Sequence, residues 1–260
     1  MGLVELEFDD QGIGTLSLND PDRRNAMSLA MAEAFSHAIN DVRKHVPARA
    51  LIITGRGKAF AAGGDLQMLK AKAELEPSVN KGRMLDFYRS FLCIQDLAIP
   101  TIAAVNGHAI GAGLCLAAAA DFRVISSTAK LGFTFTKLAL HPGMGATLFL
   151  PRLIGFGPTT DLLVTGRIFD AQEAEKLRLT QNVCESDQVV GQSETIAKSI
   201  LGTGPAAVSD LLSTLRPGSE DLNKALEREA EMQALGYARD EFIEGVTATI
   251  EKRSPLFSSG

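Results

Sequence analysis

Hydrophobic and polar positions predict alternating strands and helices in the first part of the chain. Residues 3–8 and 13–18 alternate apolar and polar side chains around an Asp-Asp-Gln-Gly turn, which predicts a β-hairpin. After Ser28, apolar residues recur at helical spacing, so we predict a helix that Ser28 caps and that ends near His45. The run ARALIIT, residues 48–54, is continuously apolar and predicts a strand buried on both faces.

Two glycine-rich turns follow predicted strands. The first spans residues 55–65 and leads into a predicted helix at 66–72. The second lies within residues 101–121, TIAAVNGHAIGAGLCLAAAAD, where a strand runs through glycines into an apolar helix. Because the first amides of a helix have no intrahelical partner, such a turn can hold a developing negative charge. The alternative is a tight connection whose small residues only let the helix pack on a sheet.

The rest of the pattern alternates strands and helices to about residue 185 and is helical from there on. We expect a mobile loop at 73–82, a helix at 83–98, a strand at 122–126 and extended structure at 130–140. Further elements are expected as a strand at 182–184 and helices at 146–154, 159–165, 171–177, 189–201, 206–215 and 220–251, the last broken at Gly236 or Gly245.

This order of elements predicts an α/β core followed by a helical appendage. The spacing between strands is too irregular for a barrel of equal βα units, and no G-x-G-x-x-G follows the first strand. A stacked or spiral arrangement of ββα units fits the pattern better.

Composition narrows the classes of function. With 260 residues, 45% of them hydrophobic, and a net charge of −5, the chain can build a large core and shows no basic surface for nucleic acid or an anionic membrane. No apolar run approaches the roughly 20 residues of a membrane span, and the acidic N-terminus resembles neither a secretory signal nor a transit peptide. Three cysteines without a C-x-x-C pair indicate reduced thiols, so we expect a cytoplasmic protein.

Several motifs, in order along the chain, resemble the crotonase, or enoyl-CoA hydratase/isomerase, superfamily. They are RRNAMS at 23–28, LIITGRGKAFAAGGDLQML at 51–69, IPTIAAVNGHAIGAG at 99–113, ADFRV at 120–124, HPGMG followed by LPRLIG, LLVTGR at 162–167 and EKRSP at 251–255. The resemblance implies an α/β fold built as a crotonase-like spiral of ββα units over residues 1–195. It also implies a C-terminal helical region, residues 196–260, that packs at a trimer interface, and trimers that often pair into hexamers.

The resemblance further implies an acyl-CoA substrate, with coenzyme A as part of the substrate and with neither a separate cofactor nor a metal. Two backbone N–H groups of the family hold the thioester oxygen, and the matching positions here are Gly64 and Ala112. Two preorganised amides of this kind stabilise the charge of a thioester enolate without any side chain.

Four further positions match the coenzyme A site of the family. Ala26 and Ala62, like Gly64, fall where the family packs the adenine and the bent coenzyme A. Arg24 and Lys252 are basic groups placed to meet the phosphates, although each could instead be a solvated surface charge.

The sequence departs from the family at the usual acid and base. Hydratases of the family use two glutamates, whereas Cys115 and Phe135 occupy these positions here, and residues 129–146 contain neither Asp nor Glu. Replacements are limited to Cys115, Asp65, Thr134, Thr136, Lys137, His141 and groups of residues 73–85.

Among these replacements His141 has the most useful pKa for proton transfer, the alternative being a histidine that stabilises a turn. Asp65 reads more readily as a helix cap than as an acid, and Cys115 more readily as a core residue than as a reactive thiolate. His108 could face the pocket.

Three functions remain open. The favoured one is an enzyme that acts on an acyl-CoA through a stabilised enolate with unusual proton handling, as an isomerase, decarboxylase, hydrolase or unusual hydratase. The alternatives are a catalytically silent acyl-CoA binder and, less favoured, a scaffold. Apolar Met68, Leu69, Phe87 and Phe91 suggest an apolar acyl chain.

Overall fold

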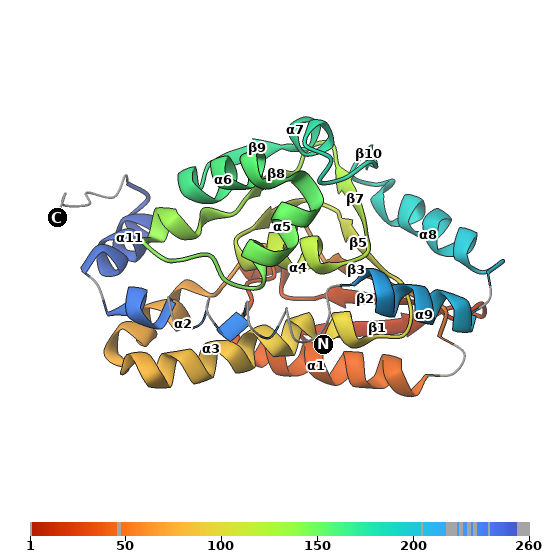
Figure 1. Cartoon of the computed structure of the whole chain (residues 1–260), viewed down its shortest axis with the longest axis horizontal. Helices are drawn as coiled ribbons and strands as arrows, with labels where there is room; N and C mark the ends of the chain where they lie inside the picture. Colours follow the sequence, from red (N-terminus) through yellow and green to blue (C-terminus); the bar gives the residue numbers. More distant parts are fainter. Residues whose placement is uncertain are drawn as a thin grey trace.

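The computed structural model describes residues 2–45, 48–203, 205–216, 223, 226–227, 230, 233–238 and 240–253. Two sheets and their covering helices make up this part of the chain (Figure 1). The six-stranded sheet has the order β1-β2-β3-β5-β7-β10, and the four-stranded sheet has the order β4-β6-β8-β9. The strands are β1 (Val4–Phe8), β2 (Ile13–Leu18), β3 (Ala50–Gly55), β4 (Ala59–Ala61), β5 (Thr101–Val105), β6 (His108–Ile110), β7 (Phe122–Ser126), β8 (Lys130–Gly132), β9 (Ile168–Asp170) and β10 (Val183–Cys184).

The chain winds as a spiral in which each turn supplies one strand to each sheet. Strands β3, β5 and β7 run parallel in the large sheet, and each continues directly into β4, β6 or β8 of the small one. A helical segment follows each pair before the next turn begins. The predicted β-hairpin is also present, because β1 and β2 pair antiparallel. The predicted fold class, a spiral of ββα units, is confirmed.

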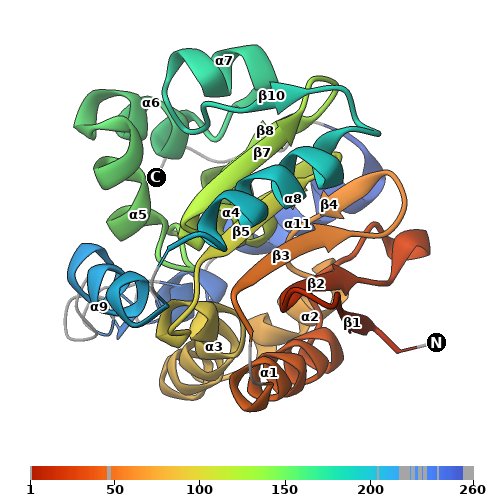
Figure 2. The ribbon, with the colours of Figure 1, turned by 90° about the vertical axis from the view of Figure 1, so that its right-hand side faces the viewer.

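Two long helices cover one side of the large sheet. In α1 (Leu29–Lys44), the Ser28 hydroxyl accepts a hydrogen bond from the Met31 N–H at 3.1 Å, which confirms the predicted cap. Beside α1 lies α3 (Pro77–Leu92) (Figure 2). The rings of Phe35 and Phe91 pack between the two helices, with centroids 5.2 Å apart.

The opposite face of the large sheet is covered by α8 (Val189–Ile200), which crosses β3, β5 and β7 (Figure 2). Leu51 and Ile53 of β3 face the main core, while Ala50 and Ile52 face α8. Burial of β3 on both faces is therefore confirmed. The expected boundary between residues 195 and 196 falls inside α8, and the division into a core and an oligomerisation region stays a prediction.

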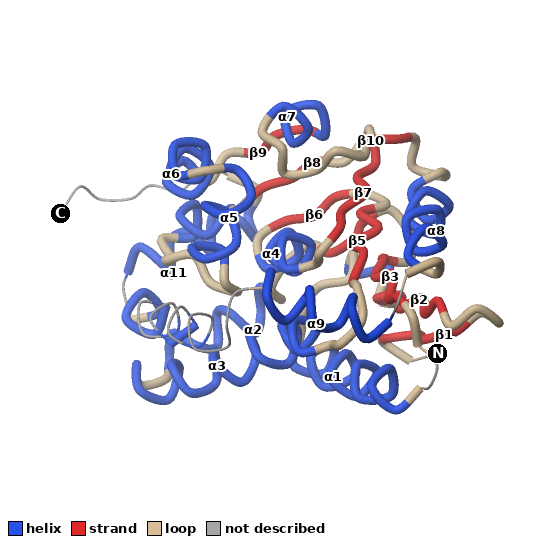
Figure 3. Tube along the Cα trace, turned by 45° about the vertical axis from the view of Figure 1, so that its right-hand side comes forward, coloured by secondary structure: helices blue, strands red, loops and turns tan. Residues whose placement is uncertain are grey.

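The remaining helices lie between or after the strands, and α4 lies centrally against β5 and β6 (Figure 3). They are η1 (Pro21–Arg23), α2 (Leu66–Ala71), η2 (Lys72–Glu74), η3 (Cys93–Asp96), α4 (Ala112–Ala119), η4 (Thr134–Leu138), α5 (Ala146–Ile154), α6 (Phe156–Thr165), α7 (Ala171–Lys176), α9 (Pro205–Leu215) and α11 (Asp240–Glu251). Among the described residues, no helix combines the length and apolar character needed to cross a bilayer.

Two sequence predictions were wrong in the middle of the chain. The expected loop at 73–82 is largely helical, because Pro77 sits in the first turn of α3, where its missing N–H costs nothing. The expected extended segment at 130–140 ends at Gly132, and the chain then coils as η4. In the C-terminal part, the described helix reaches a turn at Ala238, and α11 then passes Gly245 without a break.

Candidate active site

A pocket of about 800 Å³ lies where the two glycine turns meet. Residues of both turns line it, together with the loop after η1, the start of η4, α3 and the helical residues 233–237. Five of the residues predicted for the site line this pocket, namely Arg24, Ala26, Ala62, Gly64 and Ala112. The structure thus brings together positions that are far apart in the sequence.

Asn25 fixes the loop that carries Arg24 and Ala26. Its side chain is fully buried, and Nδ2 donates to the carbonyl oxygens of Arg56, Ala59 and Phe60 at 2.8–3.2 Å. Arg24 and Asn25 both have a left-handed backbone, with φ of 54° and 55°, a conformation that asparagine tolerates better than most residues. Asn25 was not predicted as a site residue, although an asparagine in a polar loop is a known signal for this conformation.

The Gly64 amide is set by a short parallel bridge. Met27 N–H donates to the Gly63 carbonyl at 2.8 Å, and Asp65 N–H donates to the Met27 carbonyl at 3.2 Å. In a parallel bridge the residue between these two bonds directs its own N–H away from the partner segment. Gly64 N–H therefore points away from Met27, and Gly64 lines the pocket.

The second amide belongs to Ala112, the first residue of α4. Gly111 before it has φ of 51° and donates its own N–H to the Gly132 carbonyl at 2.8 Å. As the first helical residue, Ala112 has no intrahelical acceptor for its N–H. The two turns touch, because a Cβ on Gly113 would lie 2.5 Å from the Ala61 carbonyl oxygen. Gly113 is therefore required for the close packing of the two turns.

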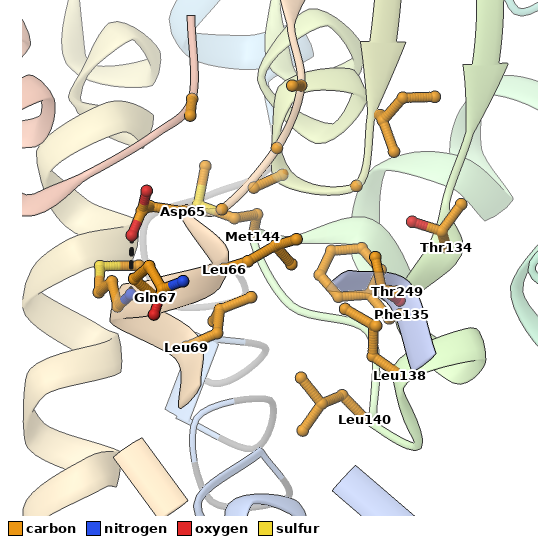
Figure 4. Close-up of a pocket in the computed structure, with 18 of the residues that line it drawn as sticks. Asp65, Leu66, Gln67, Leu69, Thr134, Phe135, Leu138, Leu140, Met144 and Thr249 are labelled. Atoms are coloured by element: carbon orange, nitrogen blue, oxygen red, sulfur yellow. Dashed lines mark hydrogen bonds between the residues drawn. The ribbon is translucent and has the colours of Figure 1, made fainter. Parts of the chain in front are cut away.

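Asp65 acts as a helix cap. Its Oδ1 accepts a hydrogen bond from the Met68 N–H at 2.7 Å at the start of α2 (Figure 4). Its Oδ2 pairs with Arg23. Both carboxylate oxygens thus have structural partners, which confirms the cap that the sequence predicted.

The predicted proton-transfer candidates lie in different places. His141 is absent from the residues that line the pocket, and its Nδ1 lies 2.8 Å from the Pro142 carbonyl oxygen. His108 is exposed, and its Nδ1 accepts a hydrogen bond from the Lys130 N–H. A catalytic role for His141 stays a prediction.

Cys115 and Phe135, at the positions of the family's glutamates, have different surroundings. Cys115 is fully buried within α4, with its Sγ 3.6 Å from the Gly143 carbonyl oxygen. Phe135 lines the pocket between Thr134 and Lys137, whereas the hydroxyl of Thr136 donates to the Leu163 carbonyl. The thiol of Cys115 therefore does not face the pocket.

The two predicted phosphate contacts differ in position. Arg24 is exposed and lines the pocket. Lys252 is exposed just after α11 and is not among the lining residues, although Thr249, three residues earlier, is. Contact of either residue with coenzyme A stays a prediction.

Most lining residues beyond the two amides are apolar. They include Met68, Leu69, Phe87, Leu138, Leu140 and Met144. The predicted Phe91 instead packs in the core beside Phe35.

A polar network missed by the sequence analysis also reaches the pocket lining. Tyr237 Oη donates to Gln233 Oε1 at 3.0 Å, and Gln233 Nε2 donates to the His141 carbonyl at 3.0 Å. Burial raises the pKa of Tyr237 well above its usual range, which keeps its phenol protonated as a donor. No group of three or more His, Cys, Asp or Glu side chains suited to a metal ion occurs in the described part of the chain.

Comparisons with known proteins agree with the resemblance to the enoyl-CoA hydratase/isomerase family. The family model described as enoyl-CoA hydratase/isomerase matches residues 9–260. The chain is 33% identical to the crotonyl-CoA hydratase of Syntrophomonas wolfei, with 96% of each chain covered. It is 34% identical to the mitochondrial methylglutaconyl-CoA hydratase of Mus musculus, with 97% of this chain and 81% of that protein covered. A crystal structure of an enoyl-CoA hydratase/isomerase from Pseudoalteromonas atlantica superposes with a TM-score of 0.85 at 29% identity, covering 98% of this chain and 100% of that one.

Proposed function

Because the chain belongs to the enoyl-CoA hydratase/isomerase family, we propose that it is a lyase or isomerase that acts on an acyl-CoA thioester through a stabilised enolate. In this proposal the amides of Gly64 and Ala112 hold the thioester oxygen. The observation that carries it is the meeting of these two amides, from turns far apart in the sequence, in the lining of one pocket.

The chemistry follows from where charge develops. When C2 of a thioester loses a proton, or when C3 of an enoyl thioester is attacked, negative charge moves to the thioester oxygen. Two fixed N–H donors stabilise that charge more than they stabilise the neutral carbonyl, and each contributes about 3 kcal/mol to lowering the barrier. The N-terminus of α4 adds its dipole in the same direction.

We assign the coenzyme A moiety to the part of the pocket lined by Ala26, Ala62 and Arg24. Ala26 and Ala62 are small residues that line it next to Gly64, and exposed Arg24 supplies a positive charge there. We assign Arg24 and Lys252 to the phosphates of coenzyme A, which enters as part of the substrate. No separate cofactor is proposed.

An exchange of Ala112 for proline tests the role of the Ala112 amide. Proline removes one N–H and suits the first position of a helix, so α4 is expected to form in Ala112→Pro. Ala171→Pro makes the same exchange at the first residue of α7 and serves as the control.

Turnover is measured with crotonyl-CoA, with 3-enoyl-CoA and with malonyl-type CoA thioesters. We expect Ala112→Pro to lose about 10²–10³-fold in kcat on the best substrate, while Ala171→Pro keeps it. Equal activity of the folded Ala112→Pro protein and the wild type would overturn the assignment of this amide.

A catalytically silent acyl-CoA binder is the second candidate. It is favoured by Cys115 and Phe135, which leave the two usual acid–base positions without a carboxylate. Calorimetric binding of acyl-CoA without turnover of any of the three thioester classes would support it. Absence of binding would exclude both candidates.

We also propose that the chain assembles in the cytoplasm as a homotrimer or a dimer of trimers through its C-terminal helices. Leu211 and Leu215 of α9 support a contact surface, being 54% and 70% exposed. Light scattering coupled to gel filtration tests the subunit number.

A further inference from the structure

A hydroxyl group lies beside the turn that carries Ala112. Thr134 is the first residue of η4 and follows the end of β8, Gly132, by two positions. A Cβ built on Gly132 would lie 3.2 Å from the Thr134 methyl group, and one built on Gly111 would lie 3.9 Å from the Thr134 hydroxyl oxygen. The methyl group is thus turned toward β8 and the hydroxyl toward the start of α4.

This hydroxyl is directed into the pocket. Thr134 is a lining residue, and Figure 4 shows its oxygen pointing into the cavity, across from the carboxylate of Asp65. In the part of the chain that the structure describes, the hydroxyl has no hydrogen-bond partner. Thr136, two residues later, donates its hydroxyl to the Leu163 carbonyl at 3.0 Å instead.

A hydroxyl that faces a pocket without a protein partner bonds to water or to a ligand. Three other groups that the sequence places at or near the usual acid–base positions do not take this role. The thiol of Cys115 is buried away from the pocket, Phe135 has no polar atom, and Asp65 already has structural partners on both oxygens.

We propose that Thr134 Oγ1 holds the water molecule that adds to C3 of a bound enoyl-CoA. This inference rests on the proposed function, since it places the water next to a thioester whose oxygen is held by Gly64 and Ala112. Thr134 is a positioning residue, because a threonine hydroxyl is not a base near neutral pH. It accepts a hydrogen bond from the water and keeps the water oxygen over the double bond.

The step is an addition of one water molecule without any redox change. The water oxygen forms a bond to C3, and the π electrons of C2=C3 move toward the thioester, whose oxygen takes the negative charge. The added oxygen releases one proton to solvent water. C2 then takes one proton from solvent water, and the thioester carbonyl re-forms.

The test compares Thr134→Val, which keeps the shape and removes the hydroxyl, with Thr134→Ser, which keeps the hydroxyl. Thr136→Val makes the same exchange where the hydroxyl bonds to Leu163 and does not line the pocket. Hydration of crotonyl-CoA gives kcat and KM. The ultraviolet absorbance of bound acetoacetyl-CoA, which reports its enolate, gives the state of the two amides independently.

We expect Thr134→Val to lower kcat about 10- to 100-fold, with KM and the acetoacetyl-CoA signal unchanged. Thr134→Ser restores most of kcat, and Thr136→Val keeps it. Unchanged kcat in Thr134→Val, or equal losses in Thr134→Val and Thr136→Val, overturns the role of Thr134 while the proposed function stands. A wild-type protein that neither hydrates crotonyl-CoA nor binds acetoacetyl-CoA overturns the proposed function itself and this inference with it.

Discussion

A methyl group placed on Gly63 would lie 2.7 Å from the carbonyl oxygen of Ile110. The two turns that carry the pocket amides therefore meet backbone to backbone, with no room for a side chain between them. Gly63 also has φ of 90°, a conformation that an L-residue rarely adopts.

Gly63→Ala is expected to lower both activity and stability. The new methyl group has to push the Ile110 carbonyl away, which shifts the adjacent amides of Gly64 and Ala112 relative to each other. We expect kcat to fall about 100-fold and the free energy of unfolding to fall by about 2–3 kcal/mol. Gly82→Ala is the control, because a Cβ at Gly82 meets nothing within 4 Å. Steady-state kinetics and urea unfolding of both variants check this, and full activity of Gly63→Ala would contradict it.

Asn25→Asp tests the asparagine that fixes the loop of Arg24. The substitution keeps the size and Oδ1 but places a carboxylate oxygen against the carbonyls of Arg56, Ala59 and Phe60. We expect a loss of about 3 kcal/mol in the free energy of unfolding, because the oxygen that replaces Nδ2 faces acceptors only, while Oδ1 keeps a donor in the Asp20 N–H. Asn40→Asp on α1 is the control, since Asn40 Oδ1 accepts from Arg43 at the surface. Similar urea midpoints for the two variants would show that Asn25 is not needed as a donor.

Helix caps could be predicted from the sequence, whereas the short strands and the conformation around Thr134 could not. The caps at Ser28 and Asp65 could be predicted because each accepts a hydrogen bond from an amide only three residues away. Strands β4 and β6 were missed, since three residues are too few to show a period. The FTFT alternation around Thr134 resembles a strand, yet η4 forms there.

The functional site depends on contacts that a local pattern does not show. Asn25 bonds to Ala59, 34 residues later in the chain. The network of Tyr237, Gln233 and His141 joins segments about 90 residues apart, as the Gln233 bond to His141 shows with a separation of 92 residues. The positions of Gly64 and Ala112 were identified through the family motifs, and the pocket they line became visible only in the fold.

Arg24→Ala tests the proposed phosphate contact. We expect the Kd for an acyl-CoA to rise about three- to tenfold at low salt, and the effect to shrink as the ionic strength rises, because an exposed charge pair is screened. An N-acetylcysteamine thioester, which lacks the phosphates, should show no change. Arg178→Ala is the control, since Arg178 is also exposed and also has a positive φ, of 62°. Equal effects on both thioesters would indicate that Arg24 shapes the loop instead. Lys252→Ala is expected to raise the Kd for an acyl-CoA in the same salt-dependent way, but by a smaller factor.

The last prediction concerns Lys72, which is only 4% exposed and whose Nζ lies 5.8 Å from the centre of the Tyr237 ring. Burial, together with the charge of Arg83, lowers the pKa of Lys72 below the ordinary lysine value of 10.5. Between the lowered pKa and 10.5 the unfolded chain binds more protons than the folded chain, so stability rises with pH through this window. Below the window the folded protein bears the full cost of burying the ammonium group.

Lys72→Met should therefore stabilise the protein, because methionine fills a similar volume without a charge. We expect the free energy of unfolding to increase by about 1 kcal/mol at pH 7, with the contact to Tyr237 offsetting part of the gain. The gain should shrink toward zero as the pH rises beyond 10.5, where the lysine becomes neutral in the unfolded chain as well as in the folded one. Urea unfolding of wild type and variant from pH 6 to beyond pH 10 measures this difference, and Lys70→Met, at an exposed position of α2, should change stability little at any pH. A gain independent of pH would show that it does not come from removing a buried charge, and a loss at pH 7 would show that the ammonium group of Lys72 stabilises the fold.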